Sequence, residues 1–458
     1  MTPGKDALTC DPVYPFLKGH LIETTGLHYY ADKDDDLAGR IHRRLSTLGV
    51  RDCASYLDIL KDPLQGRREL DELIGEITIG ETYFFRHQEH FEALRDIVLP
   101  DLIARNHAQR SLRIWSAGCA DGPEAYSLAI LLNREMSHKL VGWEVNIIAT
   151  DINRRSLARA RVGKYEEWAL RAISEDLKRD CFSKEGTSWQ IAPRFKQWIS
   201  FQYHNLVEDP APSLVNNLTA FDLIVCRNVT IYFAPDLTHK MIQRFHDCLV
   251  EGAWLLVGPA EPNMTSFSAF SAVNAPGVTL YRKGPQYPKA ATMTYPVMET
   301  SPLPPPRLPV VPTGSTPIVT PAIPEVEDRL ADVRLYADRG EWANAVRCCE
   351  RLLKKDSLNS LVHFYFGLVL GQMGRYSEAE PALRKAIYLN RQSPLPHYYL
   401  GLFLQSRGDP GQAARSFENA IELLESRPDG DVLADADGIT AGEMKKLAKM
   451  HLEVLQTR

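Results

Sequence analysis

The chain lacks the patterns that identify several common enzyme classes. It contains no GxSxG elbow and no GxxxxGK[ST] loop, and its 13 histidines include no HExxH pair. A serine hydrolase, a P-loop NTPase and a zincin protease are therefore poorly supported. The eight cysteines include no CxxC pair, so zinc-site spacing is absent. We expect reduced, mostly buried thiols and no metal.

Long hydrophobic runs and an excess of one charge are also absent. No uninterrupted apolar stretch approaches the ~20 residues of a membrane helix, and the N-terminus has no basic-then-apolar leader pattern. The formal net charge is −5, and no part of the chain is strongly basic. We therefore predict a cytoplasmic protein with no nucleic-acid partner and no direct membrane insertion. Its 458 residues predict about three domains.

The first two parts of the chain are a helical region and an α/β region. Residues 12–88 carry apolar side chains at helical spacing, for example Leu37, Ile41 and Leu45. Residues 89–284 alternate between strands and helices, and fully apolar runs favour a mostly parallel sheet. Aromatic residues mixed with turns at about 181–204 predict a small antiparallel β-subdomain. The expected strands are 112–117, 145–150, 221–226, 253–258 and 278–282, and the expected helices are 124–136, 154–162 and 236–250.

A proline-rich segment follows at 285–325. It holds 12 of the 30 prolines, and such a composition cannot build a core, so we predict an extended linker. A proline-rich ligand for a partner protein is the alternative.

Beyond the linker, residues 326–427 contain an internal repeat. Gly340, Gly374 and Gly408 are 34 residues apart, and an alanine follows five residues after each. This period is typical of tetratricopeptide (TPR) repeats, and three repeats meet the usual minimum for a stacked array. Residues 428–458 are expected to supply a capping helix. We expect the array to bind a protein partner.

Two features of the α/β region indicate a cofactor site. Residues 113–124 read as a strand, a turn bracketed by Gly118 and Gly122, and a helix, as in α/β domains that hold a small cofactor. Asp151 ends the next predicted strand, where an acidic side chain can accept hydrogen bonds from ribose hydroxyls. The alternative role for Asp151 is a helix N-cap.

The segment GETYFFR at 80–86 stands upstream of this turn. Further landmarks follow in order: ATDIN at 149–153, ARVGKY at 160–165, HNL at 204–206 and CRNVTIYF at 226–233. Together they resemble the CheR family, which methylates glutamate side chains of chemotaxis receptors with S-adenosylmethionine (SAM). The resemblance covers 12–283 and implies a Rossmann-like SAM methyltransferase domain with an N-terminal helical domain and a small β-subdomain. With the all-α TPR domain added, the chain resembles the WspC-type subgroup of surface-sensing pathways.

The resemblance implies the cofactor, its product S-adenosylhomocysteine, and the residues that hold them. Gly80 stands where enteric members have asparagine, and Pro259 where they have histidine. The positions expected at the cofactor are Gly80, Thr82, Arg86, Gly118, Glu124, Asp151, Asn205, Leu206, Asn228 and Val229.

Arg86 and Tyr232 are the expected catalytic residues. A glutamate carboxylate has a pKa of about 4.3 and is ionised at neutral pH, so no general base is required. A guanidinium matches a carboxylate in two-point contacts, and Arg86 is expected to orient the acceptor. Tyr232 is expected to line the methyl-transfer channel. The alternatives are a surface salt bridge of Arg86 with Glu89 and aromatic packing of Tyr232.

Arg40, Arg43 and Arg44 share one helical face by their spacing. The resemblance implies that this face docks the acidic helices of a methyl-accepting chemoreceptor's cytoplasmic domain; a solvated basic face is the alternative. Two rival functions remain open: a TPR-based scaffold whose methyltransferase domain binds SAM with little or no activity, and a methyltransferase for another acceptor.

Overall fold

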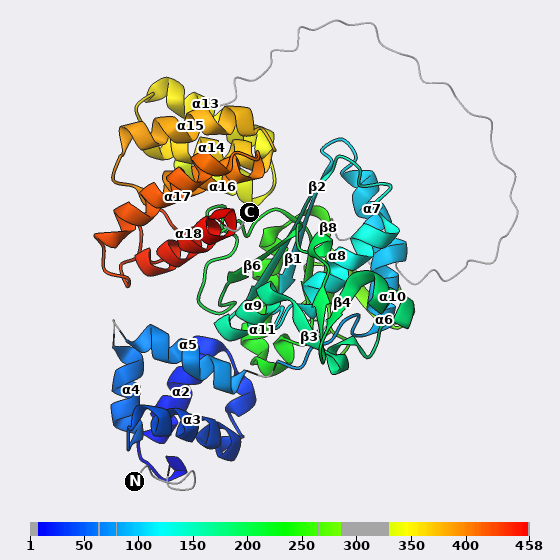
Figure 1. Ribbon diagram of the computed structural model, residues 1–458, viewed down its shortest axis with the longest axis vertical. Coiled ribbons are helices and arrows are strands. Elements are labelled where there is room, and N and C mark those ends of the chain that lie inside the picture. Colours follow the sequence, from blue (N-terminus) through cyan, green and yellow to red (C-terminus); the bar gives the residue numbers. More distant parts are fainter. Residues whose placement is uncertain (1–7, 63–64, 79, 263–264, 285–328, 457–458) are drawn as a thin grey trace, which may run out of the picture.

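The computed structural model describes residues 8–62, 65–78, 80–262, 265–284 and 329–456 (Figure 1). These residues form three parts: the helical domain (8–78), the sheet domain (80–284) and the TPR array (329–456). The expected linker lies outside the described residues. Within those ranges, no helix has the length and apolarity needed to cross a membrane.

Four α-helices build the helical domain, as their apolar spacing predicts. Leu17, Ile41, Leu45 and Leu73 are fully buried in its core. Gly49 follows the helix at Asp34–Leu48 and adopts the left-handed conformation, with φ 70°, as expected of a glycine just past a last turn. The helices are α2 (Tyr14–Thr25), α3 (Asp34–Leu48), α4 (Cys53–Lys61) and α5 (Gly66–Ile77), with the 3₁₀ turn η1 (His28–Tyr30).

The sheet domain contains the predicted, mostly parallel sheet, with the strand order β6-β2-β1-β7-β8-β10-β9. The first five strands in this order run parallel, and β10 is antiparallel to both of its neighbours. Every residue of β7 is buried, which explains why its sequence is apolar at all positions except Asp222. The strands are β1 (Ser111–Ala117), β2 (Glu144–Asp151), β6 (Ile199–Tyr203), β7 (Phe221–Cys226), β8 (Leu249–Val257), β9 (Ser271–Ala275) and β10 (Val278–Arg282).

The order of these strands reverses around β1. Chain order proceeds outward from β1 to β2 on one side and to β7 and β8 on the other. In open α/β sheets, ligands bind at such a switch point, beyond the carboxyl ends of the strands. The helices of this domain are α6 (Gln88–Ala93), the π-helical η2 (Leu94–Val98), α7 (Leu99–Arg105), α8 (Pro123–Glu135), α9 (Arg154–Val162), α10 (Glu175–Cys181) and α11 (Pro235–Cys248), with the short turns η3 (Glu167–Leu170), η4 (Pro193–Phe195) and η5 (Thr230–Tyr232).

The predicted β-subdomain is correct only in part. A separate antiparallel sheet is formed by β3 (Lys164–Glu166), β5 (Ser188–Ile191) and β4 (Phe182–Glu185). The last strand of the 181–204 stretch, β6, instead pairs in parallel with β2. Because β6 is an edge strand in which only Phe201 is buried, it has no apolar run that would identify it as part of the main sheet.

The TPR array consists of three helix pairs followed by a capping helix, as the 34-residue period predicts. Gly340, Gly374 and Gly408 have φ values of 71°, 68° and 77°, and each ends the first helix of a pair. A Cβ on Gly367 would lie 2.7 Å from Leu383 Cγ. The glycine therefore allows the helices at 360–372 and 376–389 to pack closely. The helices are α12 (Leu330–Asp338), α13 (Trp342–Lys355), α14 (Ser360–Gln372), α15 (Tyr376–Leu389), α16 (Pro394–Ser406), α17 (Pro410–Glu425) and α18 (Ala441–Gln456).

The array lies beside the sheet domain, and α18 lies near both other parts (Figure 1). Glu443 of α18 accepts hydrogen bonds from Arg67 in α5 (2.5 Å) and from Arg154 in α9 (2.8 Å). One carboxylate therefore links all three parts of the molecule.

Candidate functional site

The turn after β1 is shaped by glycine. Gly118 has φ 77°, and a Cβ there would lie 2.4 Å from Val229 Cγ2. A side chain at this position would be strained and would also collide with the loop after β7. Because Gly118 has no side chain, the segments that follow β1 and β7 can approach each other at the switch point.

A cavity lies over these strand ends. Many of the residues expected at the cofactor line it, and the helical domain contributes Thr25, Leu27 and Thr78 to the opposite wall. The cavity is therefore enclosed between two parts of the molecule. The expected residues in its wall are Gly80, Gly118, Asp151, Asn205, Leu206, Asn228, Val229 and Tyr232.

Asp151 lies in this wall, at the end of β2. Its carboxylate accepts hydrogen bonds from the backbone N–H groups of Ala120 and Asn153, both at 2.8 Å. Asn153, not Asp151, caps α9 through its own side chain, so the N-cap alternative for Asp151 is wrong. Burial raises the pKa of Asp151 to about 6. Each carboxylate oxygen keeps a lone pair that can accept from a ligand hydroxyl.

Asn228 also lines this cavity, and it carries an unsatisfied polar atom. Its Oδ1 is buried and has no hydrogen-bond partner among the described residues, and its backbone has a φ of 60°. Buried carbonyl oxygens are rarely left without a donor. This oxygen therefore lacks a donor among the described residues.

Glu261 holds the loop that carries Asn228. Its carboxylate accepts from the backbone N–H groups of Asn228, Val229 and Thr230, at 2.8–2.9 Å. It also accepts from the Thr230 hydroxyl at 2.9 Å. This role was not predicted from the sequence.

Asn205 joins the sheet domain to the helical domain at the cavity. Its Nδ2 donates to the Thr24 carbonyl at 2.8 Å, and its Oδ1 accepts from the Val207 N–H at 3.0 Å. The next residue, Leu206, also lines the cavity. The turn after β6 therefore positions one wall and fixes the helical domain over it.

Three residues expected at the cofactor are not in the cavity wall: Thr82, Arg86 and Glu124. Glu124 lies in a buried group, where it accepts from Ser116 Oγ at 2.7 Å and lies 3.4 Å from Arg227 Nη1. Burial raises the pKa of Glu124 to about 7. Arg227 in turn donates from Nε to His90 Nδ1 at 3.0 Å and from Nη2 to the carbonyl of Arg86.

His90 accepts that hydrogen bond as a neutral ring. Burial and the neighbouring Arg227 lower the pKa of His90 to about 3. Arg227 and His90 were not predicted as site residues. Together with Glu124 they position the backbone of Arg86.

Tyr232 lines the cavity, and Arg86 lies near enough for its charge to act on Tyr232. Burial raises the pKa of Tyr232, and the positive charge of Arg86 offsets part of that rise. Arg86 Nη1 donates to the Glu81 carbonyl at 2.8 Å. The expected alternative of an Arg86–Glu89 ion pair is not found in the described part of the chain, where Glu89 Oε1 lies 3.8 Å from His87.

A second arginine lies close to Arg86 on the surface. The guanidinium of Arg171 lies 3.5 Å from the ring centre of Tyr83 and 3.4 Å from that of Trp168. Trp168 is 51% exposed, and Glu81 lies 3.7 Å from Arg171. We call Tyr83, Trp168 and Arg171 the aromatic-arginine patch. It adjoins Arg86, whose guanidinium lies 5.8 Å from the ring centre of Tyr83.

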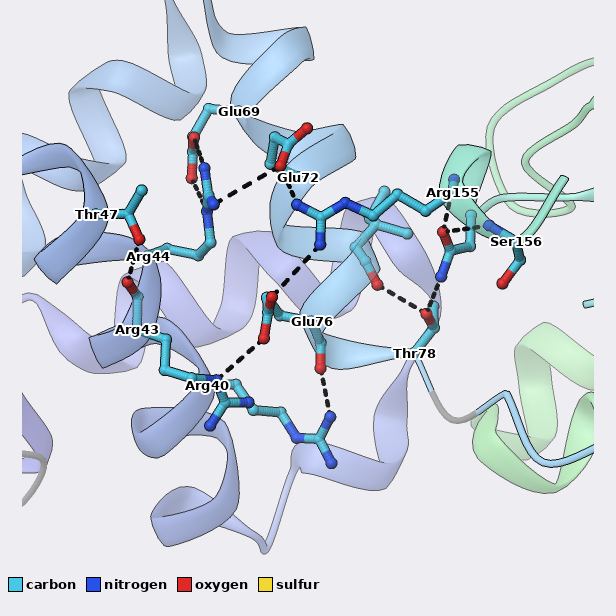
Figure 2. A network of polar contacts seen from close by, with 12 residues as sticks. Arg40, Arg43, Arg44, Thr47, Glu69, Glu72, Glu76, Thr78, Arg155 and Ser156 are labelled. Atoms are coloured by element: carbon cyan, nitrogen blue, oxygen red, sulfur yellow. Dashed lines mark hydrogen bonds and ion pairs between the residues drawn. The ribbon is translucent and has the colours of Figure 1, made fainter. Parts of the chain in front are cut away.

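The three arginines of α3 do not form one free basic face. Figure 2 shows them among carboxylates of α5, with Arg155 reaching in from α9. Arg44 is buried and makes a two-point contact with Glu69, at 2.7 and 2.9 Å. Its place on an exposed docking face is therefore wrong, because its charge is neutralised inside the helical domain.

Arg40 and Arg43 also form ion pairs, but their side chains are more exposed than that of Arg44. Arg40 Nε lies 2.9 Å from Asp36, and Arg43 Nε lies 3.0 Å from Glu76. The Arg43 side chain is 57% exposed. Of the three, Arg43 is the one that a partner could most readily reach.

Comparison with known proteins places these features in context. Residues 80–277 match the CheR methyltransferase SAM-binding domain, and residues 14–78 match the CheR methyltransferase all-alpha domain. A chemotaxis protein methyltransferase of Listeria innocua is 36% identical over 192 residues, covering 42% of this chain and 69% of that protein. A probable chemotaxis protein methyltransferase of Rhizobium etli is 34% identical over 267 residues, covering 57% and 96%.

The similarity to one protein extends beyond the sheet domain of this chain. The probable biofilm formation methyltransferase WspC of Pseudomonas aeruginosa is 27% identical over 375 residues, covering 77% of this chain and 85% of that protein. Among solved structures, the PcrH–PopD complex is similar over 28% of this chain and 88% of that chain, with 17% identity and a TM-score of 0.25.

Proposed function

Because the chain belongs to the CheR methyltransferase family, we propose that it methylates glutamate side chains on the cytoplasmic domain of a chemoreceptor. The observation that carries this proposal is the cavity itself. It brings Asp151 and the unpartnered Asn228 oxygen together, with Tyr232 in its wall and Arg86 beside Tyr232. The pathway that we propose is chemosensory or surface-sensing, in line with the relatives named above.

The cavity residues fit SAM. Asp151 offers acceptors for ribose hydroxyls, Asn228 Oδ1 offers one more acceptor, and Gly118 leaves its backbone open to a ligand. SAM, when bound, supplies a methyl group already activated on a positively charged sulfur. The chain's own residues hold the ligand between the sheet domain and the helical domain and exclude water from that space.

The acceptor requires orientation and not deprotonation. A glutamate carboxylate is ionised at neutral pH, and correct alignment of reacting groups is itself a large part of catalysis. We propose that Arg86 binds this carboxylate and that Tyr232 lines its path. The buried Glu124–Arg227–His90 group acts as support, since Arg227 donates to the backbone of Arg86.

We place acceptor docking on the surface around Arg86. The aromatic-arginine patch offers an exposed ring and a cation there, and Arg43 offers a second, partly neutralised cation on α3. Receptor segments that carry glutamates are acidic, which suits both arginines. The TPR array would bind a further protein partner.

The test is methyl transfer from radiolabelled SAM to purified receptor cytoplasmic domains. We expect label on the receptor that alkali releases as methanol, because carboxyl methyl esters are base-labile. Receptor variants with glutamate replaced by glutamine or alanine at the modified positions should accept no label.

Three other results separate the rival functions. Label that resists alkali, or label on proteins other than receptors, would favour a different acceptor. SAM binding without any transfer would favour a scaffold. Absence of SAM binding would refute the cofactor assignment itself.

A further inference from the structure

The inner groove of the TPR array is filled by a segment of the sheet domain. Residues 211–219, between β6 and β7, place Leu214 and Val215 among the buried apolar residues of the array, where they are 3% and 1% exposed. The Tyr399 hydroxyl of α16 donates to the carbonyl of Val215. Two adjacent apolar side chains and the backbone carbonyl that follows them are thus held by the array.

Polar contacts fix the rest of the segment. Three groups of the array bind it: Asp338 accepts from the Thr219 hydroxyl at 3.2 Å, Gln372 donates to Asn217 Oδ1 at 3.0 Å, and Asp437 accepts from the Ser213 hydroxyl at 2.7 Å. Asp338, Gln372 and Tyr399 belong to α12, α14 and α16, the first helix of each pair. The first helices line the concave surface through which such arrays bind partners.

Both ends of this segment lead to the cofactor cavity. On one side, Asn205 and Leu206 line the cavity, and the Asn205 N–H donates to Asp209 Oδ2 at 2.6 Å. On the other side, β7 leads directly to Asn228 and Val229, which line the cavity as well. The groove and the cavity therefore hold two parts of one continuous stretch of chain.

We propose that residues 211–219 are the resident ligand of the TPR inner groove and that their seating there keeps the cofactor cavity in its binding shape. A foreign peptide that enters the groove must displace them. Such a peptide and SAM therefore oppose each other's binding, by the same factor in both directions. This inference rests on the SAM site of the proposed function but not on the identity of the acceptor.

The first test vacates the groove in the full-length chain. The double variant Leu214→Asp/Val215→Asp puts two charges where the array is apolar, and the probe is a labelled synthetic peptide with the wild-type sequence of residues 209–220. We expect the variant to bind this peptide at least tenfold more tightly than the wild type does. A peptide with the same two aspartates is the matched control and should bind neither protein. Equal binding of the wild-type peptide to both proteins, or to neither, would overturn the occupancy.

The second test measures the coupling without relying on the double variant. Tyr399→Phe removes one hydrogen bond to the segment, and Tyr388→Phe, at an exposed tyrosine of α15, is its control. We expect Tyr399→Phe to speed hydrogen exchange in 211–219 several-fold and to raise the Kd for SAM at least twofold, with no change in the control. Faster exchange with an unchanged Kd for SAM would overturn the coupling. Neither hydrogen exchange nor the Kd for SAM requires a receptor, so a failure of receptor methylation leaves both measurements unaffected.

Discussion

The protonation state of Asp151 gives SAM binding a pH dependence. Burial raises its pKa to about 6, and only the ionised carboxylate has all its lone pairs free to accept from the two backbone N–H groups and from a ribose. We therefore expect the Kd for SAM to rise as pH falls below about 6, by up to about tenfold per pH unit. Calorimetry between pH 5 and 7.5 measures this change.

Asp151→Asn is the matched control for that titration. It keeps the shape of the side chain but removes the charge, and should weaken binding at least tenfold at pH 7.5, as expected for a lost charge-assisted hydrogen bond of roughly 1.5–3 kcal/mol. The Kd of the variant should be nearly flat with pH. An equally steep slope in the variant would assign the titration to another group.

Arg86 is expected to act on the acceptor more than on the cofactor. It lies outside the cavity wall but beside Tyr232. Arg86→Ala should lower kcat/KM for the receptor about 100-fold and change the Kd for SAM only a few-fold. Arg86→Lys should not restore the rate, since it lacks the two-point fork. Arg179→Ala, at an arginine that is 72% exposed, serves as the control; a rate loss that matches the loss of SAM affinity would contradict the orienting role.

The position of a single residue was predictable where the sequence around it shows a strand end or a turn. Asp151 and Gly118 follow directly from strand ends and turns. Glu261, Arg227 and His90 were not predicted as site residues, because they act through groups that are far away in sequence. Arg44 was misplaced for the same reason: its spacing predicts a surface, but its partner Glu69 lies on another helix.

At the scale of elements, the approach of β1 and β7 depends on Gly118. Gly118→Ala should lower the affinity for SAM at least tenfold and reduce thermal stability, because the new Cβ would meet Val229 Cγ2 and the backbone is left-handed. Val229→Ala in the same chain removes the colliding methyl group and should recover part of the loss. The double-mutant cycle, with Val229→Ala alone as reference, isolates the steric term. Strict additivity of the two changes would show that the collision is not the cause.

The elements themselves were largely predictable. The apolar runs of β1, β2 and β7 and the 34-residue glycine period predict strands and repeats because each pattern repeats within a short window. The strand β6 was assigned to the wrong sheet, because an edge strand has a weak pattern. The seating of 211–219 in the array could not be predicted, since it depends on contacts between residues more than 100 positions apart, such as Thr219 with Asp338.

At the scale of the whole molecule, the proline-rich segment suggests an independent module at its far end, yet the array packs against both other parts. Glu443 is the closest link between them: its side chain is 14% exposed and accepts from Arg67 and Arg154. Arg154 is held further by Asp71 at 3.0 Å and by the ring of Tyr203. Loss of the Glu443 charge would leave two arginines without this shared partner.

Glu443→Gln should therefore lower the free energy of unfolding by about 1–2 kcal/mol, between the values for exposed and buried ion pairs. Urea denaturation of the full-length chain measures this loss. Glu378→Gln is the control, because Glu378 forms a partly exposed ion pair with Arg375, the residue before α15, and its loss should cost almost nothing. Hydrogen exchange should also rise in α5, which holds Arg67, since the change releases the helical domain from α18. Unchanged stability together with unchanged exchange in α5 would mean that this carboxylate does not hold the three parts together, and that the other contacts between the array and the sheet domain do so.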